Sequence, residues 1–275
     1  MSSERKLSVA LGIAFLFQAT TSLISGMVPM SLIVPGSIDQ SMINIAGHAG
    51  LMRANFLGDL ITGVGVVALG VLLFVTVRRQ GEILGLIALG CYLLEVALGA
   101  VSRIPAFTLL RISQEYAVKG RPEDLQTLGN LALETMNFGF GLLMLPFCIG
   151  AILFYYLFYK SRVIPRALSL WGLISVPLAL IGTLLTISGY NTPFIIYVPY
   201  VPFEWVVGAW ILIKGLAVPA ELRLADHRPI AGHLALLGVM REDDGTNWTL
   251  RSWDGRQTLG AEGSRRYFAD CNPAS

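Results

Sequence analysis

The sequence predicts an all-α protein, a polytopic transmembrane helix bundle with six spans and short interfacial helices in its outer loops. Of its 275 residues, 54% are hydrophobic and 14% are charged, and the mean hydropathy is +0.64, which is too apolar for an ordinary soluble domain. Six apolar stretches are each long enough for a helix to cross the bilayer. Basic residues gather at alternate ends of successive stretches, as in multi-pass membrane proteins.

The six apolar stretches are predicted to be helices because lipid offers no partner for a bare backbone N–H or C=O group. A helix needs about 20 apolar residues to cross the hydrocarbon core. The last stretch starts with Pro199 and Pro202, which a helix tolerates in its first turn. The predicted spans are about Leu7–Val28, Asn55–Val77, Ile83–Ser102, Asn137–Tyr159, Ser169–Ser188 and Pro199–Leu216.

The basic residues predict that both termini lie in the cytoplasm. They occur before span one, after spans two and four, and at the end of span six, which all fall on one side of the membrane. The opposite side has basic residues too, but they are spread through longer loops and accompanied by acids. Those after span four act as a topology anchor or, alternatively, bind lipid headgroups. The residues that define the cytoplasmic side are Arg5, Lys6, Arg78, Arg79, Lys160, Arg162, Arg166 and Lys214.

Two outer loops have the spacing of short helices. In the first, apolar residues recur at helical spacing after the capping candidate Ser37, and this helix is expected to lie flat at the membrane interface. In the second, Pro122 begins an amphipathic helix that leads into span four. Aromatic residues from Phe154 to Tyr159 are expected to form a belt at the inner interface. The apolar residues of the two loop helices are Ile38, Met42, Ile45 and Ala49, then Leu125, Leu128 and Leu131.

Composition changes after the last span, so we predict two regions. Residues 1–216 form the six-helix transmembrane domain, and residues 217–275 form a cytoplasmic tail that is poorly ordered or weakly structured. The tail is mixed and charged, and its one apolar run, Leu234–Met240, is too short to cross a membrane. At about 55 to 60 residues it is at the lower limit for a domain that folds alone.

Charge and cysteine usage exclude several classes of partner. The net charge of +2 arises from 20 basic and 18 acidic residues, so no global basic field predicts nucleic-acid binding. The three cysteines show no C-x-x-C spacing, and we expect no metal or other cofactor. The expected partners are the lipid bilayer, a small polar ligand and, because Gly81 and Gly85 have small-x-x-x-small spacing, a second copy of the chain. Packing within one chain explains the same spacing.

Three acids fall inside predicted spans, where an ionisable group is costly and usually faces the bundle interior. Asp59 lies in span two, Glu95 in span three and Glu204 in span six. Counted from the outer ends at 1.5 Å per residue, Asp59 and Glu204 lie about 6 Å deep and Glu95 about 12 Å deep. All three therefore fall in the outer half, where they are candidates to line one outward-facing cavity.

Other polar residues belong to the same predicted layer. Gln18 lies in span one, Asn137 opens span four, and Arg103 lies at the outer end of span three. Arg103 follows Glu95 by eight residues, about two turns on the same helix face, so it is placed to neutralise Glu95 from above. The alternative is that each acid pairs with a basic or amide side chain and stabilises helix packing without binding a ligand.

These residues favour a protein that binds or transports a small polar or cationic ligand, or protons, through the outward-facing cavity. Two other classes stay open: a membrane-embedded enzyme that uses the carboxylates for acid–base chemistry, and a partner or sensor subunit without catalytic activity. The chain has no G-x-S-x-G, H-E-x-x-H or phosphate-loop motif. Hydrolytic zinc needs several nitrogen or sulfur ligands, and only His48 is near the three acids.

A longer pattern around the fourth and fifth spans resembles a known family. The segment Phe154-Tyr155-Tyr156-Leu157 is followed by Ser161-Arg162, Ile164-Pro165-Arg166, Ser169 and Trp171-Gly172. Together with Ser113-Gln114-Glu115-Tyr116, Gln126-Thr127-Leu128-Gly129 and the stretch from Glu204 to Gly215, this pattern is similar to the bacterial domain-of-unknown-function family 4386. The resemblance covers about Leu7 to Gly215.

The resemblance implies a six-span protein of the bacterial inner membrane. It implies no activity, cofactor or catalytic residue, because the family is defined by sequence only. The tail after Leu216 departs from the pattern, because members of the family usually end soon after the last span.

Overall fold

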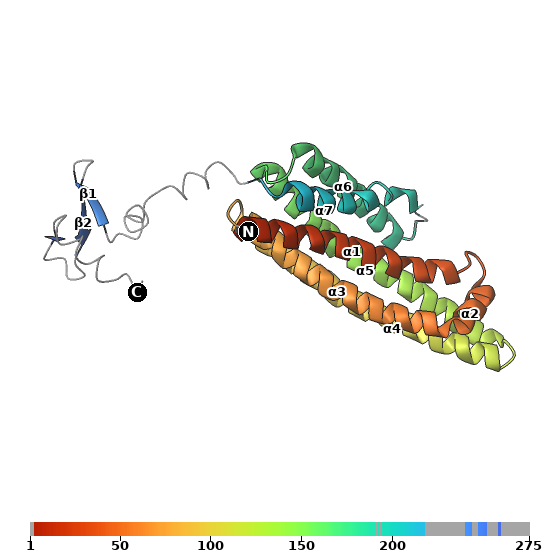
Figure 1. The fold of residues 1–275 in the computed structure, drawn as a ribbon. Helices are drawn as coiled ribbons and strands as arrows, with labels where there is room; N and C mark the ends of the chain where they lie inside the picture. Colours follow the sequence, from red (N-terminus) through yellow and green to blue (C-terminus); the bar gives the residue numbers. More distant parts are fainter. Residues whose placement is uncertain are drawn as a thin grey trace. The chain divides into compact units, whose positions relative to one another are not determined.

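The computed structural model describes residues 3–190, 192 and 194–217 and three short segments near the C-terminus. The chain divides into two compact units, Met1–Ala217 and Val218–Ser275. Within the first unit the described residues form seven α-helices and one 3-10 turn (Figure 1). These are α1 (Ser3–Leu32), α2 (Ile38–Gly47), α3 (Ala49–Val77), α4 (Glu82–Val118), α5 (Glu123–Ser161), α6 (Arg166–Ile187), the turn Phe194–Ile196 and α7 (Val201–Lys214).

Five of these helices are long and apolar enough to cross a membrane: α1, α3, α4, α5 and α6. Their outward faces expose large apolar side chains, such as Leu57, Leu60 and Val64 on α3, whose exposed fractions are 65%, 67% and 67%. Such a surface is unfavourable in water and suits lipid. The sixth predicted span is not one long helix, because its helical part, α7, has 14 residues.

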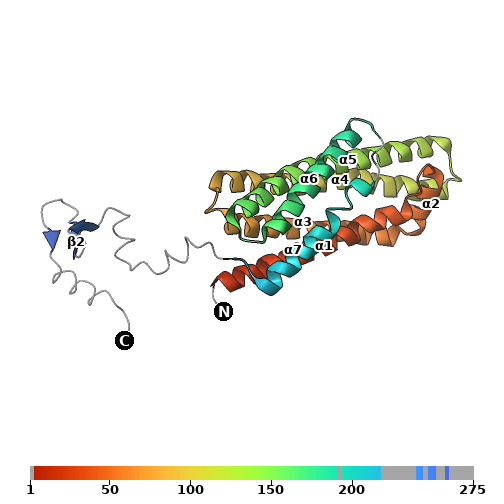
Figure 2. The ribbon, with the colours of Figure 1, turned by 90° about the horizontal axis from the view of Figure 1, so that it is seen from above.

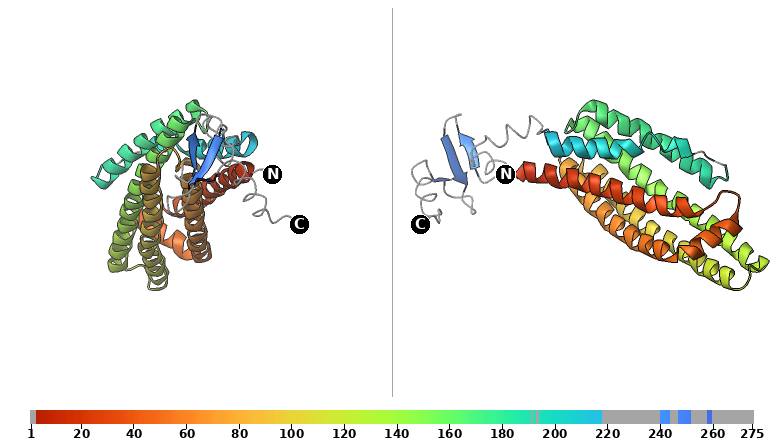
Figure 3. Two further views of the ribbon diagram at one scale, coloured as in Figure 1. Left: turned by 90° about the vertical axis from the view of Figure 1, so that its left-hand side faces the viewer. Right: turned by 45° about the vertical axis from the view of Figure 1, so that its right-hand side comes forward.

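The membrane-length helices and α7 pack in a fixed order around a shared interior. Helix α1 packs against α3, α3 against α4, α4 against α5, α5 against α6, and α7 against α1 (Figures 2 and 3). The crossing of α1 and α7 is close because both helices place a glycine there. A Cβ atom on Gly12 would lie 2.9 Å from the backbone nitrogen of Leu212 and 3.0 Å from the carbonyl oxygen of Gly208.

One end of the bundle, here called the terminal end, contains the start of α1 and the end of α7. The backbone N–H of Leu216 donates to Oγ of Ser8 at 3.1 Å. The N–H of Ala217 donates to the carbonyl of Val163, in the loop between α5 and α6, at 2.9 Å. The first and last helices of this unit therefore meet the α5–α6 loop at the same end.

The opposite end, here called the hairpin end, is formed where α4 turns into α5. At 37 and 39 residues these helices are about 55 and 58 Å long, whereas the hydrocarbon core is about 30 Å thick. Helix α2 packs against them at this end (Figures 1 and 2), and the Tyr116 hydroxyl donates to Oδ1 of Asp39 at 2.7 Å. A separate apolar core forms there from Leu32, Met42, Ile45, Met52, Leu109, Leu110, Tyr116, Leu125 and Ala132.

The predicted helix in the first outer loop is present as α2, with Ser37 as its cap. Oγ of Ser37 accepts a hydrogen bond from the backbone N–H of Gln40. The apolar face of α2 is not available to lipid, because Met42 and Ile45 are buried in the core at the hairpin end. The apolar residues of the loop therefore pack on protein instead of inserting into the interface.

The second loop does not contain a separate interfacial helix. Helix α5 begins after Pro122, as predicted, but it continues without interruption to Ser161. The buried face consists of Leu125, Gly129 and Ala132, whereas Leu128 and Leu131 are 49% and 60% exposed. Helix α4 likewise runs through Pro105, so the two spans extend beyond their predicted outer ends and only residues 119–122 separate them.

The main core contains buried residues from α1, α3, α4, α5, α6 and α7. The glycines proposed for helix contacts are used inside the chain: a Cβ on Gly85 would lie 3.1 Å from a ring carbon of Phe74, and one on Gly81 would lie 2.8 Å from a methyl carbon of Leu157. These contacts join α4 to α3 and the α3–α4 loop to α5. The two glycines therefore serve packing within one copy of the chain.

The second unit is described only in three antiparallel strands. They are β1 (Met240–Asp243), β2 (Asn247–Arg251) and β3 (Thr258–Leu259), in the order β1-β2-β3. Met240 pairs with Leu250, and Leu250 pairs with Leu259. The rest of the predicted tail lies outside the described residues, and its degree of order stays a prediction.

Candidate functional site

The buried face of α1 changes from apolar to polar along its length. Leu11 and Phe15 are fully buried in the main core. Gln18, Ser22 and Ser25 continue the same face toward the hairpin end, since residues three or four apart lie on one side of a helix. Helix α3 shows the same change, from buried leucines and valines near its C-terminus to polar residues in its first half. The interior therefore has a polar layer on the side of the hairpin end.

Asp59 of α3 lies in this layer and pairs with Arg103 of α4. Their atoms Oδ2 and Nε are 3.1 Å apart, and the side chains are 11% and 34% exposed. Oγ of Ser25, from α1, donates to Oδ1 of Asp59, and Nδ2 of Asn55 donates to Oδ2 at 3.3 Å. One carboxylate thus joins three helices, which is the contact expected of a residue that stabilises packing.

Arg103 engages Asp59 and forms no ion pair with Glu95 in the described part of the chain. The sequence spacing alone placed Arg103 above Glu95. The register of α3 and α4 decides otherwise. A Cβ on Gly63 would lie 3.3 Å from Val96, so Asp59, one turn before Gly63 on α3, is nearly level with the segment of α4 that contains Arg103. Arg103 is therefore used on the side of the polar layer that faces the hairpin end.

The chain reaches the interior again through an irregular segment before α7. The carbonyl oxygen of Pro199 accepts from Nε1 of Trp171 at 3.0 Å and from Oγ of Ser175 at 3.4 Å. The hydroxyl of Tyr197 lies 3.2 Å from Oγ1 of Thr183. Residues 194–200 therefore run beside α6 toward the terminal end, and two α6 side chains bond the carbonyl of Pro199. Irregular backbone at membrane depth requires such cover.

This path places Glu204 in the first turn of α7, inside the bundle. Its residue is 8% exposed. The Tyr200 hydroxyl donates to Oε1 of Glu204 at 2.8 Å, and the hydroxyls of Tyr200 and Tyr155 are 3.1 Å apart. A chain of two hydroxyl groups therefore links the carboxylate of α7 to α5. The dipole of α7 also favours a negative charge in its first turn.

Glu95 of α4 lies near Glu204. One carboxylate oxygen of Glu95, Oε2, is buried and has no hydrogen-bond partner among the described residues. Tyr92, one turn before Glu95, packs against Phe147 with ring centroids 6.2 Å apart, and Phe147 packs against Tyr200, one turn before Glu204, at 5.4 Å. Neither forms an ion pair with a basic side chain in the part of the chain that the structure describes. Glu95, which is half-buried, and Glu204, which is buried, are therefore two neighbouring acids without a cation of their own, here called the acid pair.

Glu204 and Glu95 lie at similar depth, and Asp59 lies nearer the hairpin end. Glu95 is about 18 Å from the start of its predicted span, at 1.5 Å per residue. A Cβ on Gly208 would lie 2.9 Å from Phe15, which is about 12 Å from the start of its own predicted span at Leu7. Glu204 lies one turn, about 6 Å, nearer the hairpin end than Gly208, so it is also about 18 Å from the start of the spans. Glu204 is thus deeper than the count along its own span placed it, because residues 194–200 run beside α6 before α7 begins.

Aromatic rings surround the acid pair. The ring of Tyr155 packs edge-on against Phe203, with centroids 4.9 Å apart, and Phe147 packs against Tyr200 at 5.4 Å. Phe154, Tyr155 and Phe158 are fully buried, so only part of the predicted interfacial belt faces outward. Sequence analysis missed Tyr155 and Tyr200 as polar residues of the site. Spacing could have separated buried Phe154, Tyr155 and Phe158 from their more exposed neighbours.

The two remaining predicted residues differ in position. Nε2 of Gln18 donates to Oγ of Ser22 at 3.0 Å, and its Oε1 is buried without a hydrogen-bond partner among the described residues. Gln18 therefore belongs to the polar layer. Asn137 is exposed on α5 and is not brought into this layer. Within the described residues, no group of three His, Cys, Asp or Glu side chains is arranged to hold a metal ion.

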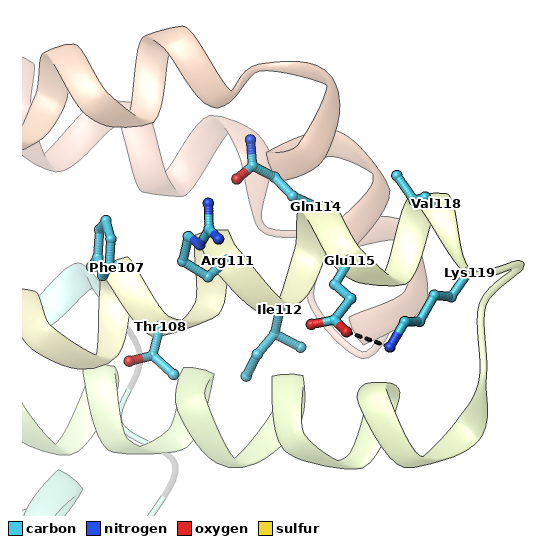
Figure 4. Close-up of a pocket in the computed structure, with 8 residues that line it drawn as sticks. All are labelled: Phe107, Thr108, Arg111, Ile112, Gln114, Glu115, Val118 and Lys119. Atoms are coloured by element: carbon cyan, nitrogen blue, oxygen red, sulfur yellow. Dashed lines mark ion pairs between the residues drawn. The ribbon is translucent and has the colours of Figure 1, made fainter.

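A surface hollow at the hairpin end is separate from the acid pair. It has a volume of about 460 Å³ and lies along the last three turns of α4 (Figure 4). The carboxylate of Glu115 turns toward the ammonium of Lys119, 2.5 Å away, and this ion pair raises the pKa of Lys119. The hollow is lined by Phe107, Thr108, Arg111, Ile112, Gln114, Glu115, Val118 and Lys119.

The fold and the polar layer define a membrane-embedded helical protein with ionisable groups in its interior. Comparison with known families identifies its group: residues 10–215 match the family described as Domain of unknown function (DUF4386), and the chain belongs to this family. The match confirms the resemblance drawn from the residues around the fourth and fifth spans. No curated protein and no solved structure matches the chain.

Proposed function

We propose that this protein binds a proton or a small cation at Glu95 and Glu204 and carries it through the membrane domain. The observation that supports the proposal is a pair of neighbouring acids, Glu204 buried and Glu95 with one buried carboxylate oxygen, without a basic partner among the described residues. Two carboxylates in a low-dielectric interior cannot both stay charged unless a positive charge compensates them. The pair therefore requires at least one bound proton or a bound cation.

Polar groups lead from the acid pair toward the hairpin end and toward α5. Toward the hairpin end, Gln18, Ser22 and Ser25 line α1 as far as the Asp59–Arg103 ion pair. Toward α5, the hydroxyls of Tyr200 and Tyr155 continue from Glu204 into the aromatic core at distances of 2.8 and 3.1 Å. Hydroxyl and carboxyl groups in series are suited to proton transfer. This arrangement favours access from the outer side through the polar layer.

The start of α7 supports an ion-binding role. Many transporters bind their substrates beside helices that are interrupted at membrane depth, because the exposed backbone ends there can compensate charge. In this protein, residues 194–200 are not α-helical and Glu204 follows in the first turn of α7. The buried acid is therefore placed at such an interruption.

We further propose six membrane crossings with both termini in the cytoplasm of a bacterium, in its inner membrane. Residues 194–214 supply the sixth crossing. The irregular segment lies beside the C-terminal half of α6, and α7 continues from it to the terminal end. The start of α1 and the end of α7 meet at that end. The loop cations that predict a cytoplasmic side, such as Arg78 and Arg162, belong to the same end.

The test is the dependence of stability on pH and cations. The full-length protein in detergent is melted across pH 5 to 9, about the range in which most proteins stay folded, in Na⁺, K⁺ or choline buffers. Glu95→Gln, Glu204→Gln and the double variant are compared with Glu134→Gln, an exposed acid on α5. Lower pH is expected to stabilise the parent protein because protonation removes repulsion within the pair.

The double variant is expected to lose this response and to gain stability at high pH, since two buried charges are removed while shape is kept. Glu134→Gln is expected to behave like the parent protein. A double variant that keeps the full pH response, and the full response to Na⁺ or K⁺, would refute a site at Glu95 and Glu204.

A further inference from the structure

A second hollow lies at the terminal end, in the loop between α3 and α4. It has a volume of about 550 Å³ and is lined by Arg78, Arg79, Gln80, Gly81 and Glu82. Both arginines are exposed. Oε1 of Gln80 is buried and has no hydrogen-bond partner among the described residues. The hollow thus combines two guanidinium groups with an amide that can turn either its oxygen or its nitrogen toward a ligand.

A second basic loop adjoins this hollow. A Cβ on Gly81 would lie 2.8 Å from a methyl carbon of Leu157, so the α3–α4 loop packs on the last turns of α5. Lys160, Arg162 and Arg166 follow directly along the chain. The two loops, residues 78–82 and 160–166, therefore form one surface with five basic side chains and one acid, Glu82.

The positive charges of this surface have no acidic partner among the described residues. In the described part of the chain, no carboxylate forms an ion pair with Arg78, Arg79 or the three cations of residues 160–166. Arg166 instead lies over the ring of Tyr159, with its guanidinium carbon 5.4 Å from the ring centroid. The half-exposed ring of Tyr159 and the exposed Tyr156 are typical of the interface of a membrane.

We propose that this surface binds the headgroup of an anionic phospholipid, with Arg78 and Arg79 holding its phosphate in the hollow. Planar guanidinium groups donate two parallel hydrogen bonds to a phosphate, and the remaining loop cations compensate the net negative charge of the lipid. Gln80 is placed to bond a polar group of the headgroup. Acyl chains continue beside the apolar outer face of α3, which ends at Val77. The site is independent of the acid pair.

The test measures lipid binding to the detergent-solubilised full chain. Phosphatidylglycerol and phosphatidylcholine are titrated separately, because both contain a phosphodiester and only the first has a net negative charge. The variant Arg78→Gln/Arg79→Gln is compared with Arg53→Gln/Arg111→Gln, which removes two exposed arginines outside these loops. A second variant, Lys160→Gln/Arg166→Gln, changes the neighbouring loop without altering the hollow.

Phosphatidylglycerol is expected to bind more tightly than phosphatidylcholine. Each basic residue near an anionic lipid contributes about a fivefold gain in binding, so loss of Arg78 and Arg79 is expected to weaken binding about 30-fold. The second variant is expected to weaken it too, and the control pair is expected to leave it unchanged. Equal binding of both lipids, or an unchanged affinity of Arg78→Gln/Arg79→Gln, would overturn the proposal. Equally effective competition by inorganic phosphate would overturn the assignment to a lipid.

Discussion

The ion pair between Asp59 and Arg103 predicts a strong coupling between α3 and α4. Replacing Arg103 by Gln leaves a carboxylate that is 11% exposed without its cation. Removing one partner of a buried pair costs about 3 to 5 kcal/mol. Because the Arg103 side chain is 34% exposed, water screens part of this interaction. Since Ser25 and Asn55 still donate to Asp59, we expect Arg103→Gln to lower the free energy of unfolding by about 2 to 3 kcal/mol.

The double variant provides the decisive comparison. Asp59→Asn leaves the arginine partly hydrated, so we expect it to cost about 1 kcal/mol. Asp59→Asn combined with Arg103→Gln should be less destabilising than the sum of the single changes by about 1 to 2 kcal/mol. Unfolding of the purified protein by a denaturing detergent, followed by fluorescence, measures these free energies. Additive costs, within about 0.5 kcal/mol, would show that the two residues do not act as a pair.

Three further predictions follow from the packing and the proposed topology. Tyr200→Phe removes two hydroxyl contacts and should lower the free energy of unfolding by about 1 to 2 kcal/mol, whereas Tyr155→Phe removes one and should cost about half as much. Equal costs would contradict the hydroxyl chain. Gly208→Val should cost about 1 to 3 kcal/mol in the same unfolding measurement, because its Cβ would lie within 3 Å of α1, and an unchanged stability would argue against the close crossing. A reporter fused after Lys214 should be active only in the cytoplasm, and Glu123→Cys in a chain without other cysteines should react with an impermeant reagent from outside. The opposite pattern would contradict the six-crossing topology.

Local signals in the sequence predicted the helices that depend on local chemistry. Ser37 followed by an apolar repeat specified α2, because a cap and a 3.6-residue period are properties of one segment. The extent of α4 was not predictable in this way. Arg103 and Arg111 suggested that the span had ended, but a helix continues beyond the membrane when protein packs on it, as α2 does here. Helix α7 begins at Val201 with Pro202 in its first turn, as the sequence allowed, but the irregular residues 194–200 before it were not predicted.

The candidate site was predictable only as a set of residues. The free-energy cost of placing an ionisable side chain in the bilayer is enough to select Asp59, Glu95 and Glu204, because each is an acid inside an apolar stretch. Which acid receives Arg103 depends on the register between α3 and α4, and the depth of Glu204 depends on the path of residues 194–200 along α6. Both are contacts between distant segments. A single sequence contains no measure of such contacts, so the acid pair emerges only from the fold.

The central claim is that Glu95 and Glu204 share a proton when no other cation is bound. Infrared spectroscopy of the purified protein, in choline buffer at neutral pH, detects the carbonyl stretch of a protonated carboxylic acid and distinguishes it from ionised carboxylates. We expect this band in the parent protein and in Asp59→Asn, and its loss in Glu95→Gln/Glu204→Gln. A parent protein without the band, or a double variant that retains it, would contradict the proposed site.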